Sequence, residues 1–392
     1  EPGEGEDGPT EPGFETRPPR IISVCGAKGG TGKSMVAANL AVYLASIGRQ
    51  VVLADADPIG ANLHTIVGVP RPATGRRWDP LGEDEPAARA AAPLLVETPV
   101  PGLRLHHAGL DEPAAGAARR TRRAKLAERL RGLRADYVVA DVGAGLTYVT
   151  MPEPTAVENT YRFLRHAFVR QLRREVRDER ARRRLLDRVR ALGGGPPPVD
   201  LWRVLEEDGD PLADPVRKLM ESFAPAVVLN QTRLRADLEL GEAMRTAARR
   251  RLGLPIAYLG HIDYDDTAWS SVRNRRLLLV ESPGAKSAKS LEKVARRLLA
   301  LAAGKRIRRE RAVPPESHHD LLEVDRGATD EEVRRAYKRA RDIYAPDALA
   351  VYGLFAPDEL DKVRTRIEEA FDVLLDPARR RQYELSVFPA ED

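Results

Sequence analysis

The sequence of 392 residues contains one cysteine, few aromatic residues and no long apolar run. Cys25 cannot form an internal disulfide, and a lone cysteine argues against a cysteine-based metal site. No apolar stretch approaches the roughly 20 residues that span a bilayer, which argues against a membrane protein. Because the first residues lack a secretory hydrophobic segment, we expect a cytoplasmic location.

Charge is distributed unevenly along the chain. The sequence has 64 Lys and Arg residues against 59 Asp and Glu, a net charge of +5. Residues 1–19 contain six acids and only Arg17 as a base, so the rest of the chain is the more basic part. The same residues are rich in glycine and proline, and we expect them to form a disordered acidic tail.

Apolar runs at strand and helix spacing begin at Arg20. A glycine-rich turn follows the first predicted strand, and Ser34–Ile47 is apolar at helical spacing. Strands that alternate with helices indicate an α/β fold with a mostly parallel sheet flanked by helices. Residues 195–199 and 304–316 resemble linkers, and 317–392 carry no strand pattern. We therefore expect an α/β domain over 20–303 and a small all-α domain over 317–392. The predicted strands are Arg20–Cys25, Val51–Ala54, Tyr137–Ala140, Tyr148–Thr150 and Ala226–Leu229.

The residues between Asp141 and Thr147 conflict with this arrangement. Neighbouring parallel strands need a connection of a dozen or more residues, which this stretch cannot supply. We therefore expect that a segment is missing near Gly145–Leu146, and a similar gap is suggested near Ala73–Arg77. A gene sequence that runs continuously through both points would contradict this.

The glycine-rich turn has the pattern of a phosphate-binding loop. Glycines let successive backbone N–H groups turn toward phosphate oxygens, and the N-terminus of the following helix adds positive potential. In such a P-loop, Lys33 contacts the β- and γ-phosphates and Ser34 is a Mg²⁺ ligand. A glycine-rich turn that binds nothing is the alternative. The predicted cradle is Gly26, Ala27, Lys28, Gly29, Gly30, Thr31, Gly32, Lys33, Ser34 and Met35.

Ala27 stands where the standard motif has glycine, but the variant Lys-Gly-Gly-x-Gly-Lys-Ser fits throughout. This variant resembles the ParA/MinD family of deviant Walker A ATPases, and most closely its FlhG-like members. The resemblance covers residues 20–303 and implies a P-loop NTPase fold of the SIMIBI type. It also implies binding of ATP or ADP with Mg²⁺, and a homodimer that encloses two ATP molecules. Lys28 would then reach the partner's nucleotide and act as a catalytic residue together with Lys33. The other matching motifs are Leu53-Ala-Asp-Ala-Asp57-Pro, Asp141-Val-Gly-Ala-Gly145 and Pro152-Glu-Pro-Thr-Ala-Val-Glu-Asn.

The resemblance assigns roles to four further polar residues. Asp57 matches the catalytic aspartate that orients the attacking water, and Asp55 and Asp57 belong to the metal environment. Asp141 matches the Walker B carboxylate that supports Mg²⁺, and Asn230 matches an adenine contact. The alternatives are an Asp-Pro turn at Asp57 and an ordinary turn residue at Asn230. Iron–sulfur reductases of the superfamily use paired cysteines, so we interpret the lone Cys25 as a packing residue.

Residues 161–190 contain twelve arginines against four acids. Apolar residues recur among them at helical spacing, which predicts an amphipathic helix with a break. One interpretation is a surface that binds DNA without sequence preference, or anionic lipid. The other is a solvated helix face with no ligand. The family resemblance extends the expected location to a cell pole, the nucleoid or the inner face of the membrane.

Residues 318–388 resemble a J-domain. Two segments carry the resemblance, one from His319 to Arg339 and one from Glu368 to Tyr383. J-domains use His-Pro-Asp to stimulate an Hsp70 partner, whereas this chain has Ala345-Pro346-Asp347. We therefore expect a J-like interaction module that retains the fold and does not stimulate Hsp70. Residual coupling to a chaperone is the alternative.

Together these patterns predict a Mg²⁺-dependent ATPase that dimerises with ATP and positions an unidentified protein cargo. Turnover would be slow and stimulated by a partner, which the J-like domain could dock. The alternative is a nucleotide-binding scaffold with little turnover, whose J-like domain carries the function. A third hypothesis is an amide-forming ligase of the same fold, which the J-like domain disfavours.

Overall fold

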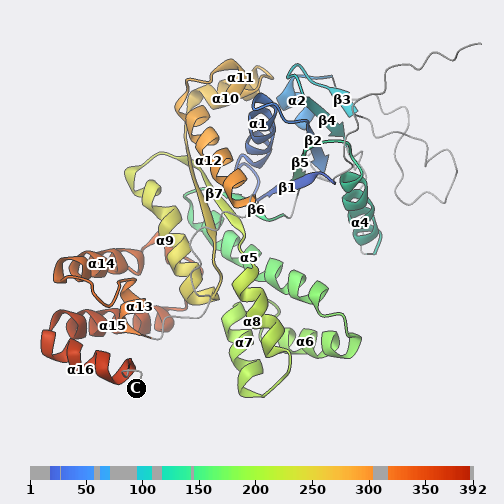
Figure 1. The fold of residues 1–392 in the computed structure, drawn as a ribbon. Helices are drawn as coiled ribbons and strands as arrows, with labels where there is room; N and C mark the ends of the chain where they lie inside the picture. Colours follow the sequence, from blue (N-terminus) through green and yellow to red (C-terminus); the bar gives the residue numbers. More distant parts are fainter. Residues whose placement is uncertain are drawn as a thin grey trace, which may run out of the picture.

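A computed structural model describes residues 18–26, 28–56, 62–70, 95–107, 117–142, 145–302 and 317–388. Within these ranges an eight-stranded sheet runs through the α/β domain in the order β3-β4-β2-β5-β1-β6-β7-β8 (Figure 1). All pairs are parallel except the edge pair of β3 and β4. The strands are β1 Arg20–Cys25, β2 Val51–Ala56, β3 Leu95–Glu97, β4 Leu103–His107, β5 Tyr137–Val142, β6 Thr147–Thr150, β7 Ala226–Thr232 and β8 Ala257–Asp263.

The short connection after β5 does not join neighbouring strands. β1 lies between β5 and β6, and Val24 is in register with Asp141 on one side and Thr147 on the other. β6 therefore starts at the level where β5 ends, so the chain crosses β1 without returning to the far end of the sheet. The Leu146 N–H donates to Ser23 Oγ at 3.0 Å during this crossing. A missing segment here stays a prediction, and Ala73–Arg77 lies outside the described residues.

Helices cover both faces of the sheet (Figure 1). One face packs against α1, α2, α11 and α12, because the alternate side chains of β1, β2, β5 and β7 share a hydrophobic cluster with them. The other face packs against α4, α5 and α9, with α6, α7 and α8 below α5. The helices are α1 Lys33–Ser46, α2 Leu63–Val67, α4 Ala117–Arg131, α5 Pro154–Glu175, α6 Glu179–Ala191, α7 Pro198–Glu207, α8 Ala213–Ser222, α9 Arg235–Leu252, α10 Asp266–Arg273, α11 Leu278–Glu281 and α12 Lys286–Ala302.

The sequence-based expectation of an α/β fold is confirmed, and the five predicted strands are present. The interpretation of 195–199 as a linker is wrong at its end, because α7 begins at Pro198. Proline is favoured in the first turn of a helix, where its missing N–H costs no hydrogen bond. The predicted arginine-rich helix is broken as expected: α5 ends at Glu175, and Asp178 caps α6 by accepting from the Ala181 N–H at 2.7 Å. Residues 1–17 and 304–316 lie outside the described residues.

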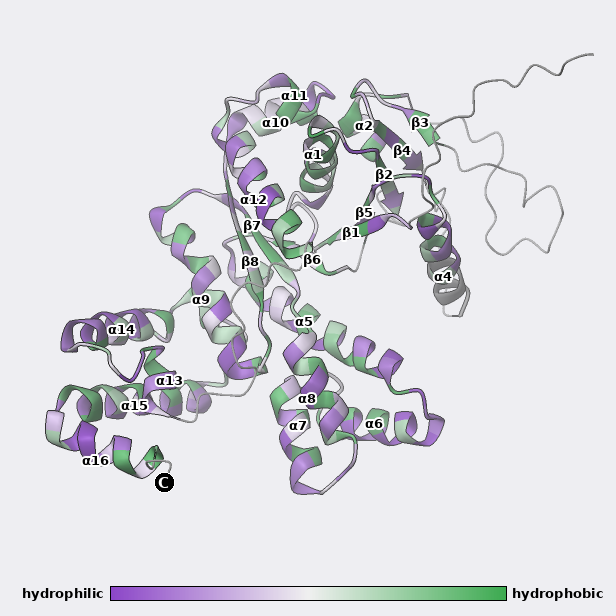
Figure 2. Cartoon of the chain, viewed as in Figure 1, coloured by the Kyte–Doolittle hydropathy of each residue, from purple (hydrophilic) through white to green (hydrophobic). Residues whose placement is uncertain are grey.

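The described C-terminal residues are helical, as predicted. α14 and α15 pack against one another, with the Tyr337 and Phe371 rings stacked at 4.0 Å between centroids. In Figure 2 the hydrophobic stripes of these amphipathic helices alternate with hydrophilic ones. The C-terminal elements are α13 His318–Leu322, α14 Asp330–Ile343, the 3₁₀ turn η1 Leu349–Val351, α15 Pro357–Leu375 and α16 Pro377–Val387.

The two domains share one hydrophobic cluster. It runs from the sheet face at Tyr148 through α5 and α9 to Tyr344 and Val351 of the J-like domain. Two of these residues, Tyr148 and Tyr344, are almost fully buried. The J-like domain is therefore packed onto the α/β domain through buried apolar side chains. Of the helices described, none is both long and apolar enough to cross a membrane.

Candidate nucleotide site

The loop between β1 and α1 has the backbone of a phosphate cradle. Gly30 and Gly32 have φ of 81° and 82°, in the left-handed region that favours glycine. Gly32 is also crowded, because a Cβ there would lie 2.3 Å from Asn230 Nδ2. At Gly26 a Cβ would lie 2.8 Å from the Val149 carbonyl oxygen. Glycine is thus required at Gly26 by close packing and at Gly32 by both conformation and packing.

Two amide side chains from the end of β7 brace this loop. Buried Asn230 donates from Nδ2 to the Thr31 carbonyl at 2.8 Å, and Gln231 donates from Nε2 to the Gly30 carbonyl at 2.9 Å. Gln231 holds a φ of 62°, which is uncommon for a residue other than glycine. These bonds turn two loop carbonyls toward β7, which leaves the loop N–H groups available to a ligand. Asn230 therefore lies at the P-loop, and its role as an adenine contact stays a prediction.

Lys28 points away from the loop toward the start of α5. Its Nζ forms an ion pair with Glu153 and lies 3.2 Å from Thr155 Oγ1. The Lys28 side chain is 39% exposed, so the ammonium group lies near solvent. Exposed ion pairs contribute at most about 1 kcal/mol, and this contact can be exchanged for another at little cost.

Asp55 and Asp141 occupy adjacent positions on neighbouring strands. They are in register between β2 and β5, near the carboxyl ends of both strands, and both are almost fully buried. Asp55 accepts the Leu63 N–H at 2.9 Å. Two adjacent buried carboxylates repel one another, and a cation bound between them would stabilise both. The donor set therefore fits a magnesium ion, which carboxylates and phosphate oxygens commonly hold together.

The remaining predicted ligands follow directly after the loop. Lys33, Ser34 and Met35 form the first turn of α1, and each is partly buried. This turn exposes the N-terminal N–H groups of a 14-residue helix, which suits an anion. Ala27 and Asp57 lie outside the described residues, so their predicted roles stay predictions. The residues that the structure describes at this site therefore fit a nucleotide phosphate with Mg²⁺.

Cys25 is fully buried at the end of β1. Burial raises the pKa of its thiol to about 12. This environment agrees with its interpretation as a packing residue.

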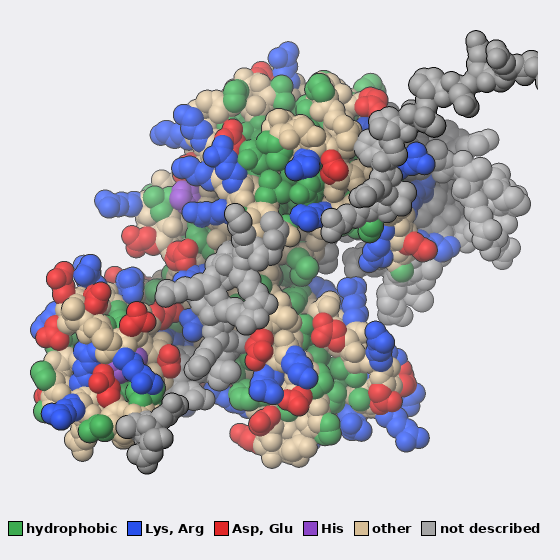
Figure 3. All heavy atoms as spheres, in the orientation of Figure 1, with side chains coloured by type: hydrophobic (Ala, Val, Ile, Leu, Met, Phe, Trp, Pro, Cys, Tyr) green, Lys and Arg blue, Asp and Glu red, His purple; other side chains and the backbone are tan. Residues whose placement is uncertain are grey.

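Several arginines of the arginine-rich stretch are paired with acidic side chains. Arg182 and Arg183 pair with Glu179, Arg188 pairs with Asp208 and Arg190 with Asp187. Figure 3 shows acidic side chains interspersed with basic ones over the lower helices on the face in view.

In the J-like domain, Pro346 and Asp347 are exposed, whereas Tyr344 and Ala350 on either side are buried.

The sequence identifies the loop and Asn230, but not the hydrogen bonds that hold the loop in place. Gln231 gave no signal beyond following a predicted strand. Glu153 and Thr155 belong to a motif that resembles the family's, but the motif alone does not show that they contact Lys28, which precedes Glu153 by 125 residues. Glu153 stands directly before Pro154, a residue typical of the first turn of a helix. An acidic side chain at this position is the signal that could have indicated a partner for a lysine.

Comparison with known proteins agrees with both domains. Residues 22–278 match the model of the CobQ/CobB/MinD/ParA nucleotide-binding domain, and residues 317–384 match the DnaJ domain. The chain is 34% identical to the chromosome partitioning protein ParA of Caulobacter vibrioides over 156 residues, which is 38% of this chain and 57% of the relative. It is 48% identical to the antiactivator FleN of Pseudomonas aeruginosa over 52 residues, which is 13% of this chain and 19% of the relative.

Among solved structures, the septum site-determining protein MinD of Pyrococcus horikoshii, complexed with Mg-ADP, aligns over 74% of this chain and 99% of its own. The sequence identity is 18% and the TM-score 0.43. The chain thus spans about a fifth of the length of FleN and just over half that of ParA. The nucleotide-binding model covers well over half of the chain, and its matched region contains the P-loop, Asp55 and Asp141. The chain belongs to the CobQ/CobB/MinD/ParA family of nucleotide-binding proteins and carries a C-terminal J-domain.

Proposed function

We propose that this protein is an ATP-dependent dimerising switch that hydrolyses ATP to control the position or assembly of a protein cargo. The ParA/MinD members of its family are ATPases, and the observation that favours a switch here is the placement of Lys28. Its ammonium group lies at the surface and is held by Glu153 and Thr155 rather than by the P-loop. A second subunit that brings a nucleotide to this surface would replace a weak contact with a phosphate contact.

The other site residues divide into holding and positioning roles. The loop from Gly26 to Ser34 would hold the phosphates, with Lys33 at the β- and γ-phosphates. Ser34, Asp55 and Asp141 would hold Mg²⁺, which neutralises charge on the phosphates when bound. Asp57 would orient the attacking water, whose oxygen forms a bond to the γ-phosphorus as the bond to ADP breaks. Lys28 of the partner subunit would stabilise the charge that develops.

The J-like domain would serve as a protein module without Hsp70 stimulation. Ala345 replaces the histidine of the J-domain motif, and the residues that follow pack on the protein's own α5 and α9. The α14 surface remains exposed and carries Arg334, Lys338 and Arg339. This exposed surface favours a second candidate function, a scaffold in which nucleotide binds with little turnover and α14 docks a partner.

The switch would bind DNA or an anionic surface through the α5–α6 region. It would then be located at the nucleoid, a cell pole or the inner face of the membrane. The observation that supports it is the exposure of Arg173, Arg174, Arg177 and Arg180 around the break between the two helices. The ion pairs further along α6 reduce the free positive charge there.

Multiple-turnover phosphate release tests the proposal. We expect release by the wild type with ATP and Mg²⁺, and a decrease of about 100-fold or more in Asp57→Ala. Asp214→Ala removes an exposed carboxylate on α8 and is the matched control. Equal and negligible release by the wild type and Asp57→Ala would favour the scaffold. Release that needs an added small-molecule acceptor would favour a ligase.

A further inference from the structure

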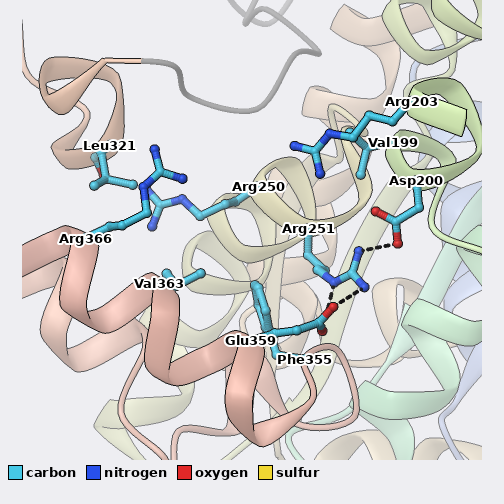
Figure 4. A pocket seen from close by; sticks show the side chains of 10 residues that line it. All are labelled: Val199, Asp200, Arg203, Arg250, Arg251, Leu321, Phe355, Glu359, Val363 and Arg366. Atoms are coloured by element: carbon cyan, nitrogen blue, oxygen red, sulfur yellow. Dashed lines mark hydrogen bonds and ion pairs between the residues drawn. The ribbon is translucent and has the colours of Figure 1, made fainter. Parts of the chain in front are cut away.

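A cavity lies at the junction between the α/β domain and the J-like domain. Its volume is about 170 Å³, and α7, α9, α13, the end of the loop after η1 and α15 all contribute to it. An engineered cavity of about 150 Å³ accommodates benzene, so this one has room for a ligand of similar size. The lining residues are Val199, Asp200, Arg203, Arg250, Arg251, Leu321, Phe355, Glu359, Val363 and Arg366 (Figure 4).

The charges around this cavity do not balance. Arg251 donates to Asp200 at 2.8 Å and to Glu359 at 2.8 Å, which occupies both carboxylates of the lining. The other three arginines of the lining, Arg203, Arg250 and Arg366, form no ion pair within the part of the chain that the structure describes. Figure 4 shows the guanidinium ends of Arg250 and Arg366 pointing toward one another from α9 and α15.

Arg250 is the most constrained of the three. It donates from Nη2 to the Leu321 carbonyl, and its guanidinium lies 4.6 Å from the centroid of the Tyr344 ring. Its Nε and Nη1 atoms are buried and have no hydrogen-bond partner among the described residues. A buried charged donor without an acceptor costs free energy, because it has lost water and gained nothing in exchange.

The positive potential extends beyond the lining. Burial lowers the pKa of Arg165 on α5, and the nearby positive charges of Arg251 and Arg162 lower it further. Arginines that gather around one cavity repel one another unless an anion lies between them. Guanidinium groups bind carboxylates and phosphates through paired N–H donors.

From this geometry we propose that the junction cavity binds a small anion that carries a phosphate or carboxylate group. Arg250 and Arg366 would each donate to it, Arg203 would add a third positive charge, and Val199, Phe355 and Val363 would contact its apolar part. Because the donors come from α7, α9 and α15, the bound anion would link the two domains. This site is separate from the P-loop and does not depend on ATP turnover.

Calorimetric titration of the full chain tests this site. A non-hydrolysable ATP analogue with Mg²⁺ at saturating concentration first fills the P-loop, including its γ-phosphate position, so that added phosphate cannot bind there. Inorganic phosphate and succinate are then titrated separately, against sodium chloride at matched ionic strength. We expect saturable binding of at least one anion, and which of the two binds identifies the chemical class. The midpoint temperature of thermal unfolding should rise in the presence of the same anion, because the anion binds the folded state.

Variants on the exposed side of the cavity keep the test independent of folding. Arg366→Gln and Arg203→Gln should each weaken binding about tenfold or more, since each removes a positive charge that attracts the anion. Arg364→Gln is the matched control, because Arg364 lies on the same helix and pairs with Asp361. Absence of saturable binding by both anions would overturn the proposal. Binding that is equal in the wild type, Arg366→Gln and Arg203→Gln would also overturn it.

Discussion

The hydroxyl of Tyr161 on α5 donates a hydrogen bond to the backbone carbonyl of Ala350 in the J-like domain, 189 residues further along the chain. Both residues are buried. Burial raises the pKa of the Tyr161 hydroxyl well above its ordinary value, so it stays protonated and remains a donor. Gly353 lies beside this bond, where a Cβ would be 2.4 Å from Glu158 Cγ. The loop of the J-like domain is therefore fitted closely to the surface of α5.

Replacement of Tyr161 by phenylalanine should loosen this junction. The Ala350 carbonyl would stay buried without its donor, which costs about 1–2 kcal/mol. We expect a lower denaturant midpoint and faster hydrogen exchange in the loop around Ala350. Tyr352→Phe is the matched control, since Tyr352 lies in the same loop with 49% of its surface exposed. An equal midpoint for Tyr161→Phe and wild type would show that the bond contributes nothing.

Gly32→Ala should abolish nucleotide binding. The left-handed backbone at this position costs about 1 kcal/mol for alanine, and the new Cβ would also collide with Asn230. Gly48→Ala separates the two effects, because Gly48 has a φ of 81° with no atom near its missing Cβ. Binding of a fluorescent ATP analogue should disappear in Gly32→Ala and persist in Gly48→Ala, whereas both variants should unfold at lower temperature. Normal binding by Gly32→Ala would refute the packing argument.

Lys28→Ala should prevent ATP-dependent dimerisation while ATP still binds. The side chain contacts Glu153 and Thr155 rather than the phosphate loop, so its removal leaves the cradle intact. Light scattering after size exclusion should show a mass that doubles with ATP and Mg²⁺ for the wild type and stays monomeric for Lys28→Ala. Turnover should fall about 1,000-fold, as when a charge supplied by a partner is lost.

Asp57→Ala should trap the dimer in the same experiment, and Lys289→Ala, an exposed lysine on α12, is the matched control for loss of charge. A mass independent of nucleotide in all of these proteins would contradict the switch.

The J-like domain should lose stability as the pH falls below about 6.5. Burial lowers the pKa of His319, although Glu384 lies 3.1 Å from its Nε2 and opposes the shift. The unfolded chain takes up a proton at His319 before the folded chain does, so acid favours unfolding. This loss of unfolding free energy ends once the pH passes below the lowered pKa. It amounts to about 1.4 kcal/mol for each pH unit by which the His319 pKa differs between the unfolded and folded chains. Arg380 is the main cause that lowers the pKa of Glu384, so that carboxylate contributes its own loss below about 4.5.

Denaturant midpoints between pH 7.5 and 5 measure this effect. His319→Gln should flatten the dependence in that range, because glutamine keeps a polar contact to Glu384 and has no proton to gain. His318 and His166, whose pKa values burial also lowers, should leave a smaller residual slope. An unchanged slope in His319→Gln would assign the pH dependence to other groups.

The parts of the fold predicted from sequence are those with a strong local pattern. Continuous apolar runs such as Val51–Ala54 identify buried parallel strands, and the glycine-rich loop identifies the phosphate cradle. β8 was missed, because Gly260 and His261 interrupt its apolar residues and its burial comes from α12 and β7. β4 was missed because it is short, with only two apolar residues among the five from Leu103 to His107.

Contacts between distant residues could not be predicted from one sequence. The pairing of Lys28 with Glu153 depends on where α5 starts relative to β1, which the sheet order sets. The register of Asp55 with Asp141 likewise follows from β2 and β5 being neighbours, although both residues were identified as candidates. The packing of the J-like loop on α5 and α9 follows from apolar residues such as Val351 and Leu354, whose spacing alone identifies no partner.

The hydrophobic cluster shared by the two domains has an evolutionary consequence. A J-like domain that is tethered loosely can be exchanged between proteins, because nothing on its host must change with it. Here a side chain gained or lost at Val351 or Leu354 must be accommodated on the opposing surface of the ATPase domain. Chains with the same fusion should therefore show paired substitutions between these loop positions and α5 or α9, and their two domains should share one line of descent.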